Sequence, residues 1–202
     1  MFLAAGAIAF GGGCLARSRY ERDCLVTEEY RIVSEKIHGP GKTIVFLTDL
    51  HNKEFGDQNC RLLDAVRKVK PDAVLSGGDG MVAKKGNSDV EIPRKLLTEL
   101  AKEFPVYCGN GNHECRMVWK SDIYGAAYEN YRAALENAGI RYLANGSADL
   151  DGEIRIYGLD LPKSAYLPRS GQIPENLLKD ALGEPDPGRF NLLLAHSPLF
   201  FE

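Results

Sequence analysis

The sequence predicts an α/β fold built on parallel strands, and three features support this prediction. Short β-branched and aromatic runs alternate with segments whose apolar residues recur at helical spacing. A cluster of polar residues follows several of the predicted strands. The 202 residues, 44% hydrophobic and 26% charged, have the composition of a soluble globular protein and enough length to bury a core. Intrinsic disorder, collagen-like repeats and a multi-span membrane protein are therefore disfavoured.

The alternation begins with the run KTIVFLT at residues 42–48, which is typical of a buried strand. Apolar residues at helical spacing then predict a helix over 62–69, and a short apolar run predicts a strand at 73–75. The same pattern predicts a helix over 96–104 and a strand at 106–108. Such alternation favours parallel strands joined by crossover helices, an architecture that binds ligands beyond the carboxyl ends of its strands.

The second half of the chain is less regular. We predict a helix at 121–138, a half-buried strand of antiparallel character at 154–157, a loop at 161–173, a short helix after Pro174 and a buried strand at 190–195. The short helix turns four apolar residues inward: Leu177, Leu178, Ala181 and Leu182. We find neither an internal repeat nor a low-complexity linker, so these elements are assigned to one domain.

Charge and cysteine content disfavour three further classes of protein. The 25 basic and 28 acidic side chains give a net charge of −3 without a basic block, so nucleic acid is not an expected partner. The five cysteines are odd in number and form no CxxC pair, which disfavours a disulfide framework and a structural zinc knuckle. We expect free thiols.

The two ends of the chain suggest a longer protein. Residues 1–16 carry no charged side chain and are followed by three arginines, as at the edge of a membrane anchor, although a full span needs about 20 apolar residues. We therefore expect part of an anchor at 1–16, a juxtamembrane segment at 17–29 and the main domain at 30–202; a peripheral N-terminus is the alternative. The protein is then expected at a membrane, on a side that the sequence leaves open, and otherwise in the cytoplasm. Because the strand at 190–195 lies so near the last residue, we also expect truncation at the C-terminus.

Polar clusters that could bind a metal follow the predicted strands. They are Asp49-Leu50-His51, Gly78-Asp79, the GNGNHE segment 109–114, and His196. Taken singly, each is more typical of a turn, a cap or a buried histidine; their order at successive strand ends favours a common site. In an extended strand end, residues two apart point the same way, so Asp49 and His51 can meet one ion. Carboxylate, imidazole and amide ligands without thiolate suit manganese, iron or zinc.

The ordered segments DLH, GGD, GNHE and LLAHS resemble the calcineurin-like metallophosphoesterases, from about Ile32 to Pro198. The resemblance is closest to a bacterial, often membrane-anchored branch. It implies a four-layer αββα sandwich with two divalent ions at the strand ends. Carried over by position, it implies that the first ion is held by Asp49 and His51, that Asp79 bridges both ions, and that the second is held by Asn112 and His196. His113 would stand over the scissile phosphate and donate a proton to the leaving oxygen.

Two departures from the family pattern affect what we expect of the site. The usual final GHxH motif does not occur before the chain ends, so the sandwich and the metal site are expected to be incomplete, and this chain alone is expected to be inactive. Val82 stands where the phosphoprotein phosphatase branch carries a second Asp, which disfavours a protein phosphatase. Any carboxylate that orients His113 must then come from elsewhere. We expect Asn110 and Glu114 to be solvent-facing turn residues; the alternative is that they orient the metal ligands from behind. We expect Arg116 to meet either a substrate phosphate or solvent.

The expected activity is hydrolysis of a phosphate monoester, diester or pyrophosphate by a water that bridges two metal ions. The substrate class includes small phosphate esters and lipid-linked substrates. The alternative is a non-catalytic, metal-dependent binding or structural domain, against which the presence of His113 argues. A P-loop hydrolase is suggested superficially by the segment GPGKT at 39–43, but Lys36 replaces the first Walker glycine and a strand follows.

Overall fold

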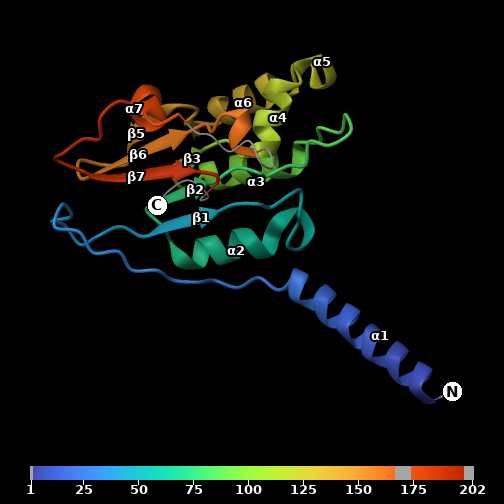
Figure 1. The fold of residues 1–202 in the computed structure, drawn as a ribbon. Coiled ribbons are helices and arrows are strands. Elements are labelled where there is room, and N and C mark those ends of the chain that lie inside the picture. The colour runs from blue at the N-terminus through green and yellow to red at the C-terminus, as the bar shows by residue number, and fades with distance from the viewer. Residues whose placement is uncertain (1, 167–173, 198–202) are drawn as a thin grey trace.

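Two β-sheets lie face to face, with helices on their outer sides (Figure 1). The computed structural model describes residues 2–166 and 174–197. The first sheet is parallel, in the order β1 (Ile44–Leu47), β2 (Ala73–Ser76), β3 (Val106–Cys108) and β4 (Arg141–Tyr142). The second contains β5 (Gly146–Asp149), β6 (Ile154–Leu159) and β7 (Phe190–Ala195), with β6 antiparallel to β5 and parallel to β7. The predicted α/β class is confirmed.

The alternating side chains of β2 separate two layers of core. Val74 faces a cluster made largely by the helices α2 (Cys60–Val69), α3 (Glu91–Ala101) and α6 (Ala127–Asn137). Its neighbours Ala73 and Leu75 face the other way and pack with Ile156 of the second sheet. Because successive side chains of a strand point to opposite faces, this one strand contributes to both the helix–sheet and the sheet–sheet core.

The outer face of the second sheet is covered more lightly. Helix α7 (Leu177–Leu182) and the 3₁₀ turn η2 (Lys163–Tyr166) pack there against Leu159 through a third, small cluster. The resulting layer order is helix, sheet, sheet, helix, as expected from the family resemblance. The prediction that Leu178 points inward is wrong, since 43% of this residue is exposed. Of the predicted loop at 161–173, residues 167–173 lie outside the described part of the chain.

Two other sequence predictions need correction. The apolar run at 190–195 forms β7 as predicted, but β7 is half-buried rather than buried, because it pairs with β6 on one side within the described residues and leaves Leu193 39% exposed. The single helix predicted at 121–138 is two helices, α5 (Ser121–Tyr124) and α6, separated at Gly125, which has a φ of 57°. A further helix, α4 (Asn112–Trp119), begins inside the GNHE segment, and a 3₁₀ turn η1 (Asp57–Asn59) precedes α2.

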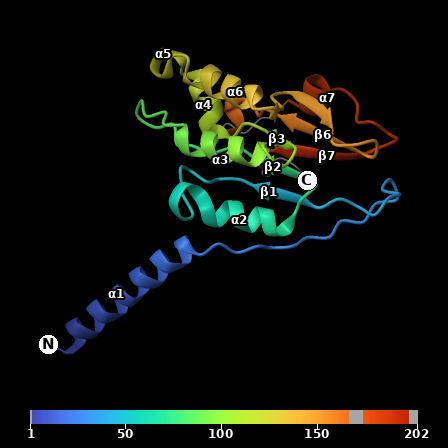
Figure 2. The same ribbon diagram turned by 180° about the vertical axis from the view of Figure 1, so that it is seen from behind.

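The N-terminal helix α1 (Phe2–Asp23) projects away from the two sheets in both views (Figures 1 and 2). Its last residue, Asp23, forms an ion pair with Lys53, and its carbonyl accepts a hydrogen bond from Arg61 at 3.4 Å. This end of α1 therefore contacts the segment that follows Asp49 and His51. Among the described helices, α1 included, we find none with the length and apolarity required to cross a membrane. Membrane association through this segment stays a prediction.

Candidate metal centre

The loop that follows β1 is held by the main chain of the loop that follows β2. The N–H groups of Asp49 and His51 donate to the carbonyls of Gly78 and Asp79, at 3.1 and 2.9 Å. Asp49, His51 and Asp79 all have φ between 49° and 56°, a left-handed conformation that is uncommon outside glycine. Asp49 and His51 therefore reach the site from a left-handed turn and not from an extended strand end, as the sequence had predicted. Such backbone conformations are strained, and the main-chain hydrogen bonds to Gly78 and Asp79 hold the chain in them.

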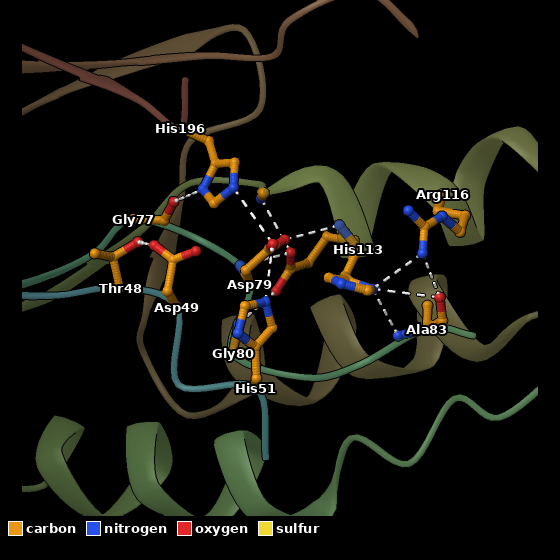
Figure 3. A network of polar contacts seen from close by, with 12 residues as sticks. Thr48, Asp49, His51, Gly77, Asp79, Gly80, Ala83, His113, Arg116 and His196 are labelled. Atoms are coloured by element: carbon orange, nitrogen blue, oxygen red, sulfur yellow. Dashed lines mark hydrogen bonds and ion pairs between the residues drawn. The ribbon is translucent and has the colours of Figure 1, made fainter. Parts of the chain in front are cut away.

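Asp79 lies at the centre of the cluster and is 2% exposed (Figure 3). Its Oδ2 lies 3.2 Å from His51 Nε2 and 3.4 Å from His196 Nε2, and its Oδ1 accepts the His113 main-chain N–H at 2.8 Å. With its amide nitrogen turned toward Asp79, Asn112 also donates to Oδ2, at 2.9 Å. Burial opposes ionisation, but the hydrogen bonds from His196 and His113 lower the pKa of Asp79 below its ordinary value. Asp79 is therefore a buried carboxylate surrounded by donors.

His196 comes to this carboxylate from the second sheet, one residue after β7. Its Nδ1 lies 3.0 Å from the carbonyl of Gly77, so Nδ1–H donates there and Nε2 faces Asp79. Burial works against the charged ring, but the hydrogen bond and charge of Asp79 raise the pKa of His196 to about 9. A histidine whose Nδ1–H is engaged by a carbonyl offers Nε2 as a metal ligand.

Two glycines allow the loops after β2 and β3 to touch. A Cβ on Gly78 would lie 2.1 Å from the main-chain nitrogen of Gly111, and a Cβ on Gly111 would lie 2.3 Å from Asp79 Oδ1. Gly78 also has a φ of +90°, which favours glycine.

The potential ligands form two groups that share Asp79. One contains Asp49, Asp79 and His196, and the other His51, Asp79 and His113; within each group the candidate ligand atoms lie within 4.8 Å of one another. Oxygen and nitrogen donors at this spacing fit borderline divalent ions. All predicted ligands meet at Asp79, but the grouping pairs Asp49 with His196 rather than with His51. The assignment of each residue to a particular ion stays a prediction.

The profile of the calcineurin-like phosphoesterase family matches residues 42–201. The chain belongs to this family. A search of curated proteins found no significant match. The family match covers each of the clusters from which the centre is built, and members of the family are generally hydrolases of phosphate esters that use divalent metals.

Glu114 of this calcineurin-like phosphoesterase is not the solvent-facing residue that we expected. It is 2% exposed, and its carboxylate accepts the N–H groups of Asp79, Gly80 and Gly111 at 2.9, 3.2 and 3.0 Å. Burial, together with the charge of Asp79, raises the pKa of Glu114 to about 7. The carboxylate thus joins the loops that follow β2 and β3.

Asn110 is also buried, contrary to the prediction that it faces solvent. Its amide nitrogen donates to Tyr128 Oη at 3.0 Å and to the carboxylate of Asp160 at 2.9 and 3.1 Å, and its oxygen accepts from Tyr142. Burial raises the pKa of Asp160. These hydrogen bonds fix the main chain just before the GNHE segment by tying Asn110 to Tyr128, Tyr142 and Asp160. The burial of Asn110 and Glu114 favours the alternative, an orienting role, over the solvent-facing one. A polar residue in a turn gives no sequence signal of burial, which is why the sequence favoured the solvent-facing description.

The cysteines near the site pack in the core. Cys108 and Cys115 are buried free thiols, and burial raises the pKa of Cys108 to about 12 and also raises that of Cys115. A thiol with a raised pKa is a poor nucleophile. All five cysteines are free, as predicted.

Proposed function

We propose that the protein hydrolyses phosphate esters with two divalent ions, for which this chain supplies ligands at the strand ends. The ligands in this proposal are Asp49, His51, Asp79, Asn112 and His196, and the ions are manganese, iron or zinc. The observation that supports it most directly is the position of Asp79, whose buried carboxylate is common to both groups of potential ligands. A carboxylate shared in this way offsets the repulsion between two cations.

When bound, the two ions supply a water of lowered pKa and offset the charge that develops on the phosphate. The residues of the chain position the site and donate the proton. The buried carboxylate of Glu114 keeps the loops around Asp79 in place, and His196 is oriented through Gly77. His113 lies beside the ligands, its ring centroid 5.3 Å from that of His51, and is the donor assigned to the leaving oxygen.

The substrate class in this proposal is a phosphate monoester, diester or pyrophosphate, either small or lipid-linked. The uncharged segment 1–16 supports the lipid-linked member of that class, through association with a membrane. A panel of monoester, diester and lipid pyrophosphate substrates, assayed on the full-length protein with added manganese, iron or zinc in turn, would rank them. Hydrolysis of none of them with any of the three metals would contradict the proposal.

The role of Asp79 is tested by Asp79→Asn, because an amide cannot offset two cations as a carboxylate does. We expect most bound metal and nearly all hydrolysis to be lost, as measured by metal analysis and turnover of the purified protein. Asp122→Asn, on the exposed surface of α5, is the matched control and should change neither. Two ions per chain at wild-type affinity in Asp79→Asn would remove this residue from its proposed role.

His113→Gln tests whether His113 donates a proton to the leaving oxygen. We expect metal content to stay near normal while turnover falls by about 10²–10⁴-fold, the usual range for a lost acid or base. The loss should be greatest for leaving groups of high pKa and small for nitrophenolate. Unchanged turnover would show that His113 takes no part in hydrolysis.

A further inference from the structure

The Nδ1 side of the His113 ring faces two groups that can only donate hydrogen bonds. The main-chain N–H of Ala83 lies 3.0 Å from Nδ1, and Nη1 of Arg116 lies 3.3 Å from it. Figure 3 shows the ring between His51 on one side and Ala83 and Arg116 on the other. Because an amide N–H and a guanidinium have no acceptor atom, Nδ1 can only accept from these two neighbours. In the neutral ring the proton is then on Nε2.

One nearby acceptor could favour the opposite tautomer. The carbonyl of Ala83 lies 3.3 Å from His113 Nδ1, but Arg116 Nη1 already donates to this carbonyl at the shorter distance of 2.7 Å. Moving the ring proton to Nδ1 would set it against both the Ala83 N–H and the guanidinium. Arg116 therefore satisfies the competing acceptor and opposes the competing tautomer.

The surrounding fold keeps these partners in place. Arg116 follows His113 by three residues on α4, a spacing that puts both side chains on one face of a helix. Ala83 is completely buried, as is Met81 before it, so the main chain that carries the N–H donor is anchored in the core. The ring is thus held by one fixed backbone group and one neighbouring side chain.

We infer that Arg116 is a positioning residue that, with the main chain of Ala83, holds His113 with its proton on Nε2. This inference rests on the proposed function, because Nε2–H is then the donor that His113 offers to the phosphate ester. Val82 replaces the Asp of the phosphoprotein phosphatase branch, so no carboxylate at that position can orient His113; Arg116 and the Ala83 N–H orient the ring instead. A carboxylate beside Nδ1 would accept a proton from that nitrogen, whereas here both fixed neighbours donate to it.

The tautomer can be read directly from ¹⁵N-labelled, metal-free protein. Long-range ¹H–¹⁵N spectra, recorded at a pH where the ring is neutral, should show His113 with a protonated Nε2 and an unprotonated Nδ1. Arg116→Met should increase the fraction with Nδ1 protonated, whereas Arg116→Lys should largely preserve the wild-type spectrum. Arg94→Met, which removes an arginine from α3, is the control and should leave His113 unchanged. A wild-type ring protonated on Nδ1 would overturn the inference.

A double-mutant cycle tests the role in hydrolysis. We expect Arg116→Met to lower kcat by about 10- to 100-fold, the usual cost of removing a partner that orients a site histidine, with little change in KM. In a His113→Gln background the same change should cost less than about twofold, because nothing is left to orient. An equal loss in both backgrounds, or a rise in KM alone, would overturn the inference. If the wild type hydrolyses no phosphate ester, the proposed function fails, while the spectra still test the tautomer.

Discussion

The two sheets contribute unequally to the candidate site. The loops of the first sheet supply most of its side chains: Asp49, His51, Asp79, Asn112 and His113. These loops are tied to each other by main-chain hydrogen bonds and by the Glu114 carboxylate. The second sheet supplies His196, which reaches the others through Gly77 and Asp79.

The side chains that cover the first sheet are also more deeply buried than those that cover the second. The helices on the first sheet bury Leu96, Leu100 and Leu135 to 2% exposure or less. Helix α7 on the second sheet has no fully buried residue, and Leu193 of β7 is 39% exposed. The first sheet is therefore a firm platform for the site, whereas the position of His196 depends on how the second sheet rests on the first.

The largest effect should come from breaking the platform at Glu114. Glu114→Ala leaves three buried N–H groups without their acceptor. Each unpaired group lowers the stability of the folded protein by about 1–3 kcal/mol. The variant no longer bears the cost of burying a carboxylate, which offsets part of this loss. We therefore expect the free energy of unfolding to fall by about 4 kcal/mol, measured by urea denaturation of the metal-free protein. Glu129→Ala, on the exposed side of α6, should cost less than about 0.5 kcal/mol. A similar small loss for Glu114 would mean that the loops are held without it.

An intermediate effect is expected where the second sheet rests on the first. Leu194 is 5% exposed and packs on Gly109, where a Cβ would lie 3.0 Å from Leu194 Cδ2. Leu194→Ala should lower the free energy of unfolding by about 2–3 kcal/mol and weaken metal binding through His196. Leu193→Ala, one residue away on the exposed face of β7, should cost less than about 1 kcal/mol and leave metal binding intact. Equal costs at the two positions would show that β7 is not docked through this face.

Four of the described strands were predicted more closely than the helices between them, whereas β4 and β5 were not predicted. Short apolar runs bounded by proline and polar residues placed β1, β2, β3 and β7 within about two residues, since a buried parallel strand leaves an almost continuous apolar pattern. The break at Gly125 was missed because apolar residues recur at helical spacing on both sides of it. They pack in different helices, Tyr124 in α5 and Tyr131 in α6, and tertiary contacts decide where the chain turns.

The site was predictable in its residue types and order, and less so in its geometry. The ordered motifs named the candidate ligands, and the structure brings these side chains together at Asp79. The burial of Glu114 could not be foreseen, because its partner Asp79 lies 35 residues away in the sequence. The left-handed conformation of Asp49 and His51 was also missed. Asp and His are enriched among the non-glycine residues that adopt it, but the apolar run before Asp49 suggested that an extended strand continues through both residues.

The last effect concerns His196, the one candidate ligand supplied by the described part of the second sheet, and it is a dependence on pH. The pKa of His196 in the folded, metal-free protein is raised to about 9 from an ordinary value of 6.5, so the ring carries a proton at pH 7 that must leave before Nε2 can hold an ion. Affinity for the ion bound by His196 should therefore rise with pH, by about tenfold or 1.4 kcal/mol per unit between pH 7 and 9, and level off above.

Calorimetry of manganese binding in buffers of different ionisation enthalpy measures the proton directly. At pH 7.5 we expect the wild type to release about one proton from His196, and His196→Asn to lose both that proton and the slope of affinity with pH. Leu193→Ala serves as the control, because it alters the same strand without touching the site. If wild type and His196→Asn release equal numbers of protons, the second sheet contributes no metal ligand, and the site must be formed by the loops of the first sheet.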